Sequence, residues 1–140
     1  MTTITIPSSV TEIGSGAFED CQSLSQIDLN KVEVINFGAF NGTSLKEIIL
    51  PTTARDVSDY AFFNAPIQRL VVPEGSALNF ICIRGCSGLK SLEIMSPISV
   101  EWDSNAKFTL TIVPGVKLFV NKKDYNCLKK IIFKGTKAEW

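Results

Sequence analysis

The chain has 140 residues, 45% hydrophobic and 20% charged, a balance typical of one folded domain that excludes a disordered segment. Its longest apolar runs, such as Leu70–Val72, are far too short to span a bilayer, so no membrane span is expected. The net charge is zero, and the absence of histidine excludes Ser-His-Asp and Cys-His catalytic groups and metal sites that need an imidazole.

The chain begins with a short strand around Ile4 and Thr5 that has no capping element before it. An exposed sheet edge is therefore expected there, where edge-to-edge self-association with a second molecule is possible. Residues 1–7 contain no signal peptide, because they lack a basic start, a long apolar stretch and a small-residue cleavage site. If the natural protein is exported, we expect its signal to have been removed from this sequence.

One pattern then repeats along the chain, Leu-x-x-Leu-x-Leu with aliphatic or aromatic substitutes. It occurs five times, at residues 24–29, 45–50, 67–72, 89–94 and 128–133. Its strand positions Ile4, Ile27, Ile48, Leu70 and Leu92 follow one another at steps of 23, 21, 22 and 22 residues. These steps lie in the leucine-rich-repeat range of roughly 20 to 29 residues. We predict a right-handed leucine-rich-repeat solenoid, mainly β, with a parallel sheet of short strands and short helical or irregular turns on the convex side.

The residues between the strands repeat as well. An alanine-phenylalanine pair recurs with Phe18, Phe40 and Phe62, and Cys82 and Ile83 take the same positions in the fourth coil. Small alanines let coils approach closely while the phenylalanines can stack through the interior. Prolines that end the strands and turn the chain outward stand at positions 7, 51, 73 and 114.

The first coil, residues 6–24, has the skeleton Ile-Pro-x-x-Val-x-x-Ile-Gly-x-x-Ala-Phe-x-x-Cys-x-x-Leu. This skeleton resembles the BspA-like leucine-rich repeats of bacterial and protist cell-surface proteins. Later coils match less well, with Asn30 where proline is expected and Arg84-Gly85 where the phenylalanine-led turn should run. The resemblance implies a secreted or cell-surface protein that engages host or microbial macromolecules.

We expect a single solenoid domain over residues 1–140, with regular coils over about 4–95, an irregular coil over about 96–109 and a closing segment over about 110–140. The ending resembles a tail that more sequence usually follows, so we expect a piece of a longer array. Eight lysines and two acids from Lys107 onward give this end a charge of +6, against −6 before it. A solvated face is favoured over a docking surface for an acidic partner, and nucleic acid is not expected because interleaved aromatics are lacking. The basic patch comprises Lys117, Lys122, Lys123, Lys129, Lys130 and Lys134.

No catalytic residue, metal site or cofactor is predicted. Cys21 and Cys86 hold the same slot three coils, or roughly 14 Å, apart, which is too far for a disulfide or a shared zinc. Cys21, Cys82 and Cys86 are expected to be buried free thiols, and Cys127 aligns with Ser23, where it can be exposed. Carboxylate neighbours that invite a glycosidase interpretation fall at outward positions and are interpreted as solvated surface. They are Glu19 with Asp20, Asp56 with Asp59, and Glu101 with Asp103.

Two short motifs also favour turns over functional sites. Gly14-Ser15-Gly16 lacks the third glycine of a phosphate loop, and Asn41-Gly42-Thr43 matches the N-glycosylation pattern, which three residues often match by accident.

The residues at the strand centres should face outward together and form one continuous plane. Ile49 and Val71 are adjacent apolar residues on this face, flanked by Glu47 and Arg69, and form either a chance pair or a contact patch. The candidate binding residues are Thr5, Asp28, Glu47, Ile49, Arg69, Val71, Glu93, Thr111 and Ile132.

The leading hypothesis is a non-catalytic binding or adhesion module that engages a protein or glycan through this face. The alternative is a passive spacer that displays another domain. A carboxylate-dependent glycan hydrolase using Asp56 or Asp59 is the remote alternative.

Overall fold

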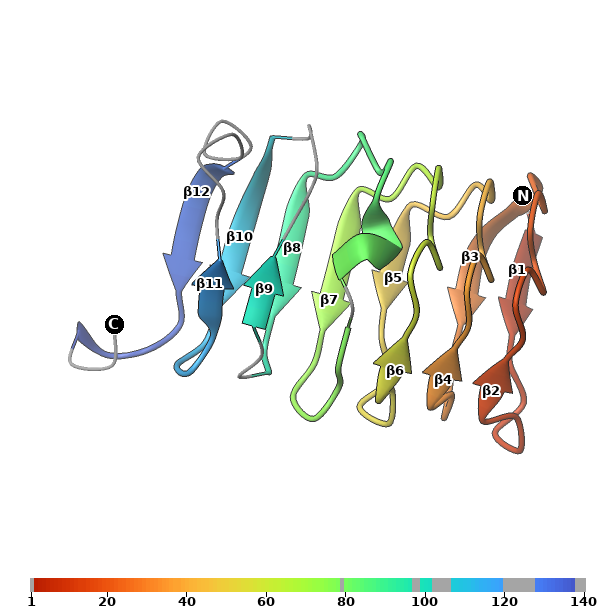
Figure 1. The fold of residues 1–140 in the computed structure, drawn as a ribbon, viewed down its shortest axis with the longest axis horizontal. Helices are drawn as coiled ribbons and strands as arrows, with labels where there is room; N and C mark the ends of the chain where they lie inside the picture. Colours follow the sequence, from red (N-terminus) through yellow and green to blue (C-terminus); the bar gives the residue numbers. More distant parts are fainter. Residues whose placement is uncertain (1, 79, 97–98, 102–106, 120–127, 138–140) are drawn as a thin grey trace.

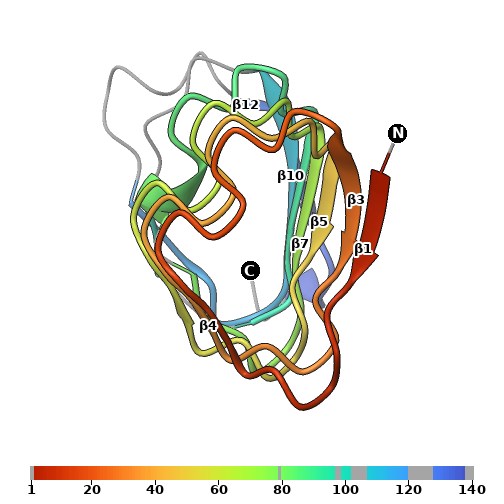
Figure 2. The same ribbon diagram turned by 90° about the vertical axis from the view of Figure 1, so that its right-hand side faces the viewer.

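The chain folds into a solenoid of parallel strands, which confirms the predicted leucine-rich-repeat architecture (Figure 1). The computed structural model describes residues 2–78, 80–96, 99–101, 107–119 and 128–137. Viewed end on, successive coils lie over one another around a common interior (Figure 2). The first row of strands comprises β1 (Thr2–Thr5), β3 (Leu24–Asp28), β5 (Glu47–Ile49), β7 (Arg69–Val72), β8 (Ser91–Ile94), β10 (Phe108–Ile112) and β12 (Leu128–Phe133).

The strand register follows the sequence period. Ile4 pairs with Ile27, and the ladder Ile48, Leu70, Leu92 and Leu110 runs through four adjacent strands. From Ile48 onward these side chains are buried, because alternate residues of each strand point into the coil. The last of these steps is only 18 residues long, so a shortened coil closes between β8 and β10.

The first row is not one continuous sheet, which corrects the expected single plane. Strands β1 and β3 form one sheet and β5, β7, β8, β10 and β12 form another. Among residues 24–50, all of which the structure describes, no strand pairing joins β3 to β5. The break coincides with the one step of 21 residues and with Asn30, whose φ of 48° lies in the left-handed region, in place of proline.

A second row of short strands, which the sequence pattern did not predict, forms the opposite side of each coil. It comprises β2 (Glu12–Ile13), β4 (Val34–Ile35), β6 (Asp56–Val57), β9 (Ser99–Glu101) and β11 (Lys117–Phe119). Ile13, Ile35 and Val57 are buried, so each two-residue strand anchors its coil through one inward side chain. Between β6 and β9 a 3₁₀ helix, Phe80–Ile83, forms the turn that corresponds to the one containing Ala61 in the preceding coil, as the expected short helical turn.

The predicted phenylalanine spine is confirmed. Phe18 and Phe40 stack with ring centroids 5.2 Å apart, and Phe40 and Phe62 stack at 5.5 Å. The backbone holds this spacing, since the Phe40 N–H donates to the Ala61 carbonyl at 2.7 Å and the Phe62 N–H donates to the Cys82 carbonyl at 2.9 Å. Cys82 therefore replaces alanine in the fourth coil, as the repeat alignment predicts.

The turns between the rows repeat a left-handed backbone position. Gly16 and Gly38 each have a φ of 63°, and Tyr60 has a φ of 58° at the equivalent position 22 residues later. Asn41-Gly42-Thr43 also forms a turn, as predicted. Gly42 has a φ of 67°, and the buried Thr43 hydroxyl donates to the Phe40 carbonyl at 2.9 Å.

Candidate functional site

The outward residues of the five-stranded sheet form two in-register rows. One row runs through Ile49, Val71, Glu93, Thr111 and Ile132 on β5, β7, β8, β10 and β12. The structure therefore brings together the predicted binding residues of these strands, with Glu47 and Arg69 paired beside them. Thr5 and Asp28 pair with each other in the separate β1–β3 sheet.

Exposure differs sharply along this sheet face. Ile49 is 57% exposed and Ile132 38%, whereas Val71 is half-buried. Thr111 is buried, which corrects the prediction that it is available to a partner. It occupies the outward row, but its short side chain lies between the longer Glu93 and Ile132 side chains of the adjacent strands.

A network of two ion pairs fixes the side chains beside Ile49. The Arg69 guanidinium donates through Nε to Glu93 at 2.8 Å and through Nη1 to Glu47. These hydrogen bonds raise the pKa of Arg69 above its already high ordinary value. The three groups therefore hydrogen-bond to one another across β5, β7 and β8, and Ile49 is the exposed apolar residue beside them.

The break in the first row opens a groove of about 890 Å³ between β3 and β5. Its lining residues include Asp28, Lys46, Glu47 and Ile49. Ile49, which the sequence predicts to contact a partner, therefore lies at this groove. The sequence did not predict this groove. The 21-residue step and Asn30 are the signals that mark its place.

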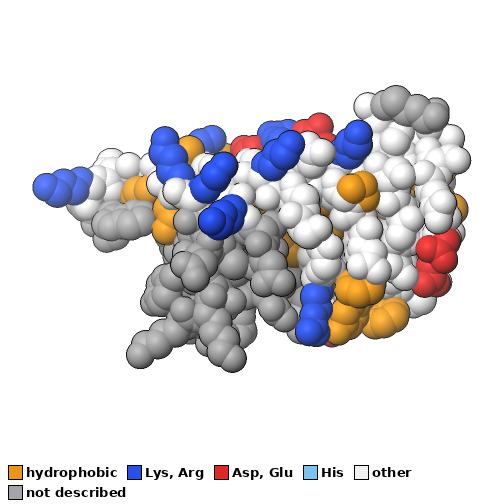
Figure 3. Space-filling view, turned by 90° about the horizontal axis from the view of Figure 1, so that it is seen from above, with side chains coloured by type: hydrophobic (Ala, Val, Ile, Leu, Met, Phe, Trp, Pro, Cys, Tyr) orange, Lys and Arg blue, Asp and Glu red, His pale blue; other side chains and the backbone are white. Residues whose placement is uncertain are grey.

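A second pocket, of about 360 Å³, was also missed and contains an aromatic cluster. Phe37 meets Tyr60 edge to face at 5.5 Å, and Tyr60 meets Phe63 in the same way at 5.3 Å. Figure 3 shows hydrophobic side chains gathered at one edge of the N-terminal half of the molecule, next to a basic side chain. Phe37 is 58% exposed, the largest exposed fraction among the exposed large hydrophobic residues. The signals in the sequence were Phe37 beside the left-handed Gly38, Phe63 beside the left-handed Asn64, and Tyr60 at the position where the preceding coils have glycine.

Tyr60 occupies its turn position at a conformational cost. Its φ of 58° falls where Gly16 and Gly38 stand in the preceding coils, and a bulky side chain there costs of the order of 1 kcal/mol. Arg84 donates from Nη1 to the tyrosine hydroxyl at 3.2 Å, which holds the ring over the pocket.

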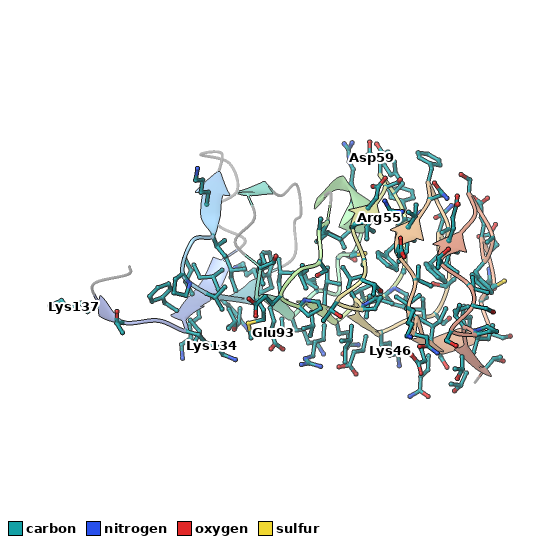
Figure 4. The ribbon with its side chains drawn as sticks, turned by 90° about the horizontal axis from the view of Figure 1, so that it is seen from below. Lys46, Arg55, Asp59, Glu93, Lys134 and Lys137 are labelled. Atoms are coloured by element: carbon teal, nitrogen blue, oxygen red, sulfur yellow. The ribbon has the colours of Figure 1, made fainter. Side chains whose placement is uncertain are left out.

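The pocket and the sheet face lie on opposite sides of the solenoid. Figure 4 places Arg55 and Asp59, next to Tyr60 in the sequence, on one side, and Lys46, Glu93 and Lys134 on the other.

The basic C-terminal residues are divided between the two rows of strands. Lys129, Lys130 and Lys134 are exposed on or just after β12, whereas the exposed Lys117 belongs to β11 in the second row. Lys122 and Lys123 lie outside the described residues. The lysines that are described therefore do not gather on a single face.

Cys82 and Cys86 are buried free thiols, as predicted, but Cys21 is exposed, which corrects that part of the prediction. Cys21 lies in the first coil, where no preceding described coil covers it, and Cys127 lies outside the described residues. Burial raises the pKa of Cys86 to about 12 and that of Cys82 well above its ordinary value. Both thiols therefore stay protonated and unreactive at neutral pH.

This burial predicts which thiols react. In a Cys21→Ser, Cys127→Ser variant, Ellman's reagent should detect no thiol in the folded protein at pH 8 and two after denaturation. Because the pKa of Cys86 rises from 9.0 to about 12 on folding, its protonated form stabilises the fold below about pH 9. That stabilisation should be lost as pH rises from about 9 towards 12. Rapid labelling of the folded variant at pH 8 would contradict the burial.

The predicted carboxylate neighbours are surface groups wherever they are described. Glu19, Asp20 and Asp56 are exposed, and Asp59 is half-buried. The Glu101 side chain and Asp103 lie outside what is described. Across the described ranges, no three His, Cys, Asp or Glu side chains lie close enough together to hold a metal ion.

The described part of the chain contains no helix with the length and apolar character that crossing a membrane requires.

Two solved protein structures are similar to this chain. A leucine rich cell surface protein from Faecalibacterium prausnitzii has 17% identity and a TM-score of 0.48, over 100% of this chain and 62% of its own. A leucine-rich repeat protein from Bacteroides ovatus has 22% identity and the same TM-score, over 94% of this chain and 55% of its own. The chain thus spans less than two thirds of either protein. No match was found among curated proteins.

The repeat itself matches a known family. Residues 1–108 match the BspA type leucine rich repeat region in six copies, which covers well over half of the chain. The repeat skeleton, the coil register and this match agree, and the chain belongs to the BspA type leucine rich repeat family.

Proposed function

We propose that this chain is a non-catalytic binding module of a secreted or cell-surface protein and that it engages a protein or glycan through its sheet face. The observation that carries the proposal is Ile49, a large aliphatic side chain 57% exposed on the rim of the groove between β3 and β5. Ile49 pairs with the half-buried Val71, and an apolar centre of this kind beside a groove, with paired charges around it, supports an interaction site.

The charged residues around Ile49 support this assignment. Arg69 pairs with both Glu47 and Glu93, so each of the three charged groups has a partner and together they keep a net charge of −1, which favours a partner with a basic or hydrogen-bond-donating edge. Asp28 and Lys46 on the groove walls provide a polar rim of both signs. The expected contact is therefore an apolar centre with charged edges, in which Ile49 contributes most of the affinity.

The substitution Ile49→Asp tests this function. It should weaken capture of the partner at least about tenfold, because it places a carboxylate at the apolar centre, while thermal unfolding stays nearly unchanged. The chain is immobilised and exposed by biolayer interferometry to a panel of purified extracellular proteins and polysaccharides. Thr11→Asp is the control, since Thr11 is exposed and directly precedes β2 on the opposite side of the solenoid, so it adds the same carboxylate away from the sheet face.

Equal loss with both variants, or full binding by Ile49→Asp, would remove the sheet face from the proposal. A chain that binds no member of the panel would favour the passive spacer. No catalytic role is proposed for Asp56 or Asp59, and turnover that is lost on substituting either would revive the hydrolase.

A further inference from the structure

The pocket around Phe37, Tyr60 and Phe63 is not used by the sheet-face function, since it lies on the other side of the coils. Its apolar part consists of aromatic rings that meet edge to face, at interplanar angles of 61° and 81°. With 58% of Phe37 exposed, this arrangement leaves flat ring area open to a ligand. A flat apolar ligand surface, such as the C–H face of a pyranose ring, is the chemical match for such a platform.

The polar part of the pocket offers both kinds of hydrogen-bonding group. The Asn41 side chain donates from Nδ2 to Glu19 Oε1 at 2.8 Å, which orients both side chains and leaves the Asn41 amide oxygen and Glu19 Oε2 to accept. The Tyr60 hydroxyl accepts from Arg84, so its own proton can be donated. A ligand rich in hydroxyl groups can satisfy all of these groups at once.

The charged residue that lines the pocket is a carboxylate, from Glu19. The Arg84 guanidinium lies next to the pocket, where it already donates to the Tyr60 hydroxyl. The pocket volume of about 360 Å³ lies at the lower end of the usual range for small-ligand sites. A neutral sugar unit fits these limits better than a sulfated or uronic-acid unit, whose charge Glu19 would repel.

The backbone at Tyr60 provides an independent observation. Two preceding coils hold glycine at this left-handed position, yet the third coil holds a tyrosine whose ring lines the pocket. Residues kept in such conformations cluster at ligand sites, where the side chain compensates for the strain. We propose that this pocket is a binding site for a neutral pyranose sugar, with Phe37 as the stacking platform and Glu19, Asn41 and Tyr60 as hydrogen-bonding groups.

Isothermal titration calorimetry of the full chain with neutral hexaoses tests the proposal. The probes are cellohexaose, mannohexaose, xylohexaose and chitohexaose, with polygalacturonate as the acidic comparison. At least one neutral probe should bind, and Phe37→Ala should weaken it at least about tenfold through the loss of the stacking surface. Tyr60→Gly should also weaken binding without lowering the unfolding temperature, because glycine removes the strained conformation.

The control variant is Ile49→Asp on the sheet face, which should bind the sugar normally. This control separates the sugar site from the sheet-face function, because each can fail while the other holds. Four outcomes would each overturn the proposal: no neutral probe binding at millimolar concentration, binding to polygalacturonate alone, sugar affinity unchanged in Phe37→Ala, or a protein partner that Phe37→Ala loses while no sugar binds.

Discussion

Phe40→Ala should destabilise the chain by about 3–5 kcal/mol, a large share of the roughly 5–15 kcal/mol that stabilises a domain. Phe40 is fully buried and stacks on Phe18 on one side and Phe62 on the other, so truncation opens a cavity between two coils. The backbone bond from Phe40 to Ala61 holds both coils in place and limits collapse around the cavity. Urea unfolding followed by circular dichroism measures the loss.

Phe37→Ala is the matched control, because the same side chain is removed three residues earlier in the same coil. Phe37 is 58% exposed and has one edge contact with Tyr60, so its loss should cost less than about 1 kcal/mol. If the two variants unfold at the same urea concentration, the phenylalanine spine does not hold the coils together as described.

The features that repeat in every coil could be predicted from the sequence. Apart from the 18-residue step between β8 and β10, the strand register and the phenylalanine stack depend on residues spaced by 21 to 23 positions, and the inward side chains of a strand alternate. The second row of strands was not predicted, because Glu12–Ile13 and its equivalents are two residues long and have no alternation to detect. Short strands of this kind are recognised only once stacked coils pair them.

The two proposed binding surfaces depend on departures from the repeat, which are harder to interpret. Ile49 was predicted to be outward from strand alternation alone, but the groove beside it lies where β3 and β5 are not paired, at the one step of 21 residues. Thr111 follows the same alternation and is nevertheless buried, since exposure depends on the size of its neighbours in adjacent strands. Tyr60 departs from the repeat most clearly, as a non-glycine residue at a left-handed position. Both proposed binding surfaces therefore lie at deviations from the period.

Ala61→Leu should destabilise the chain by about 2–3 kcal/mol, through overpacking instead of a cavity. Ala61 is fully buried, and its carbonyl accepts the Phe40 N–H at 2.7 Å, so the two coils have no room for three more carbon atoms. A leucine there must displace Phe40 or Phe62 or separate the coils. In either case the Phe40–Phe62 stack is disturbed.

Hydrogen exchange by NMR can locate this effect, since the Phe40 amide proton should exchange faster in Ala61→Leu as its bond to residue 61 weakens. Ala17→Leu is the control, because Ala17 holds the same slot in the first coil but is exposed. Its expected cost is within about 0.5 kcal/mol. An Ala61→Leu variant as stable as Ala17→Leu, with the Phe40 amide still protected, would mean that close approach of the coils is not what the buried alanines provide.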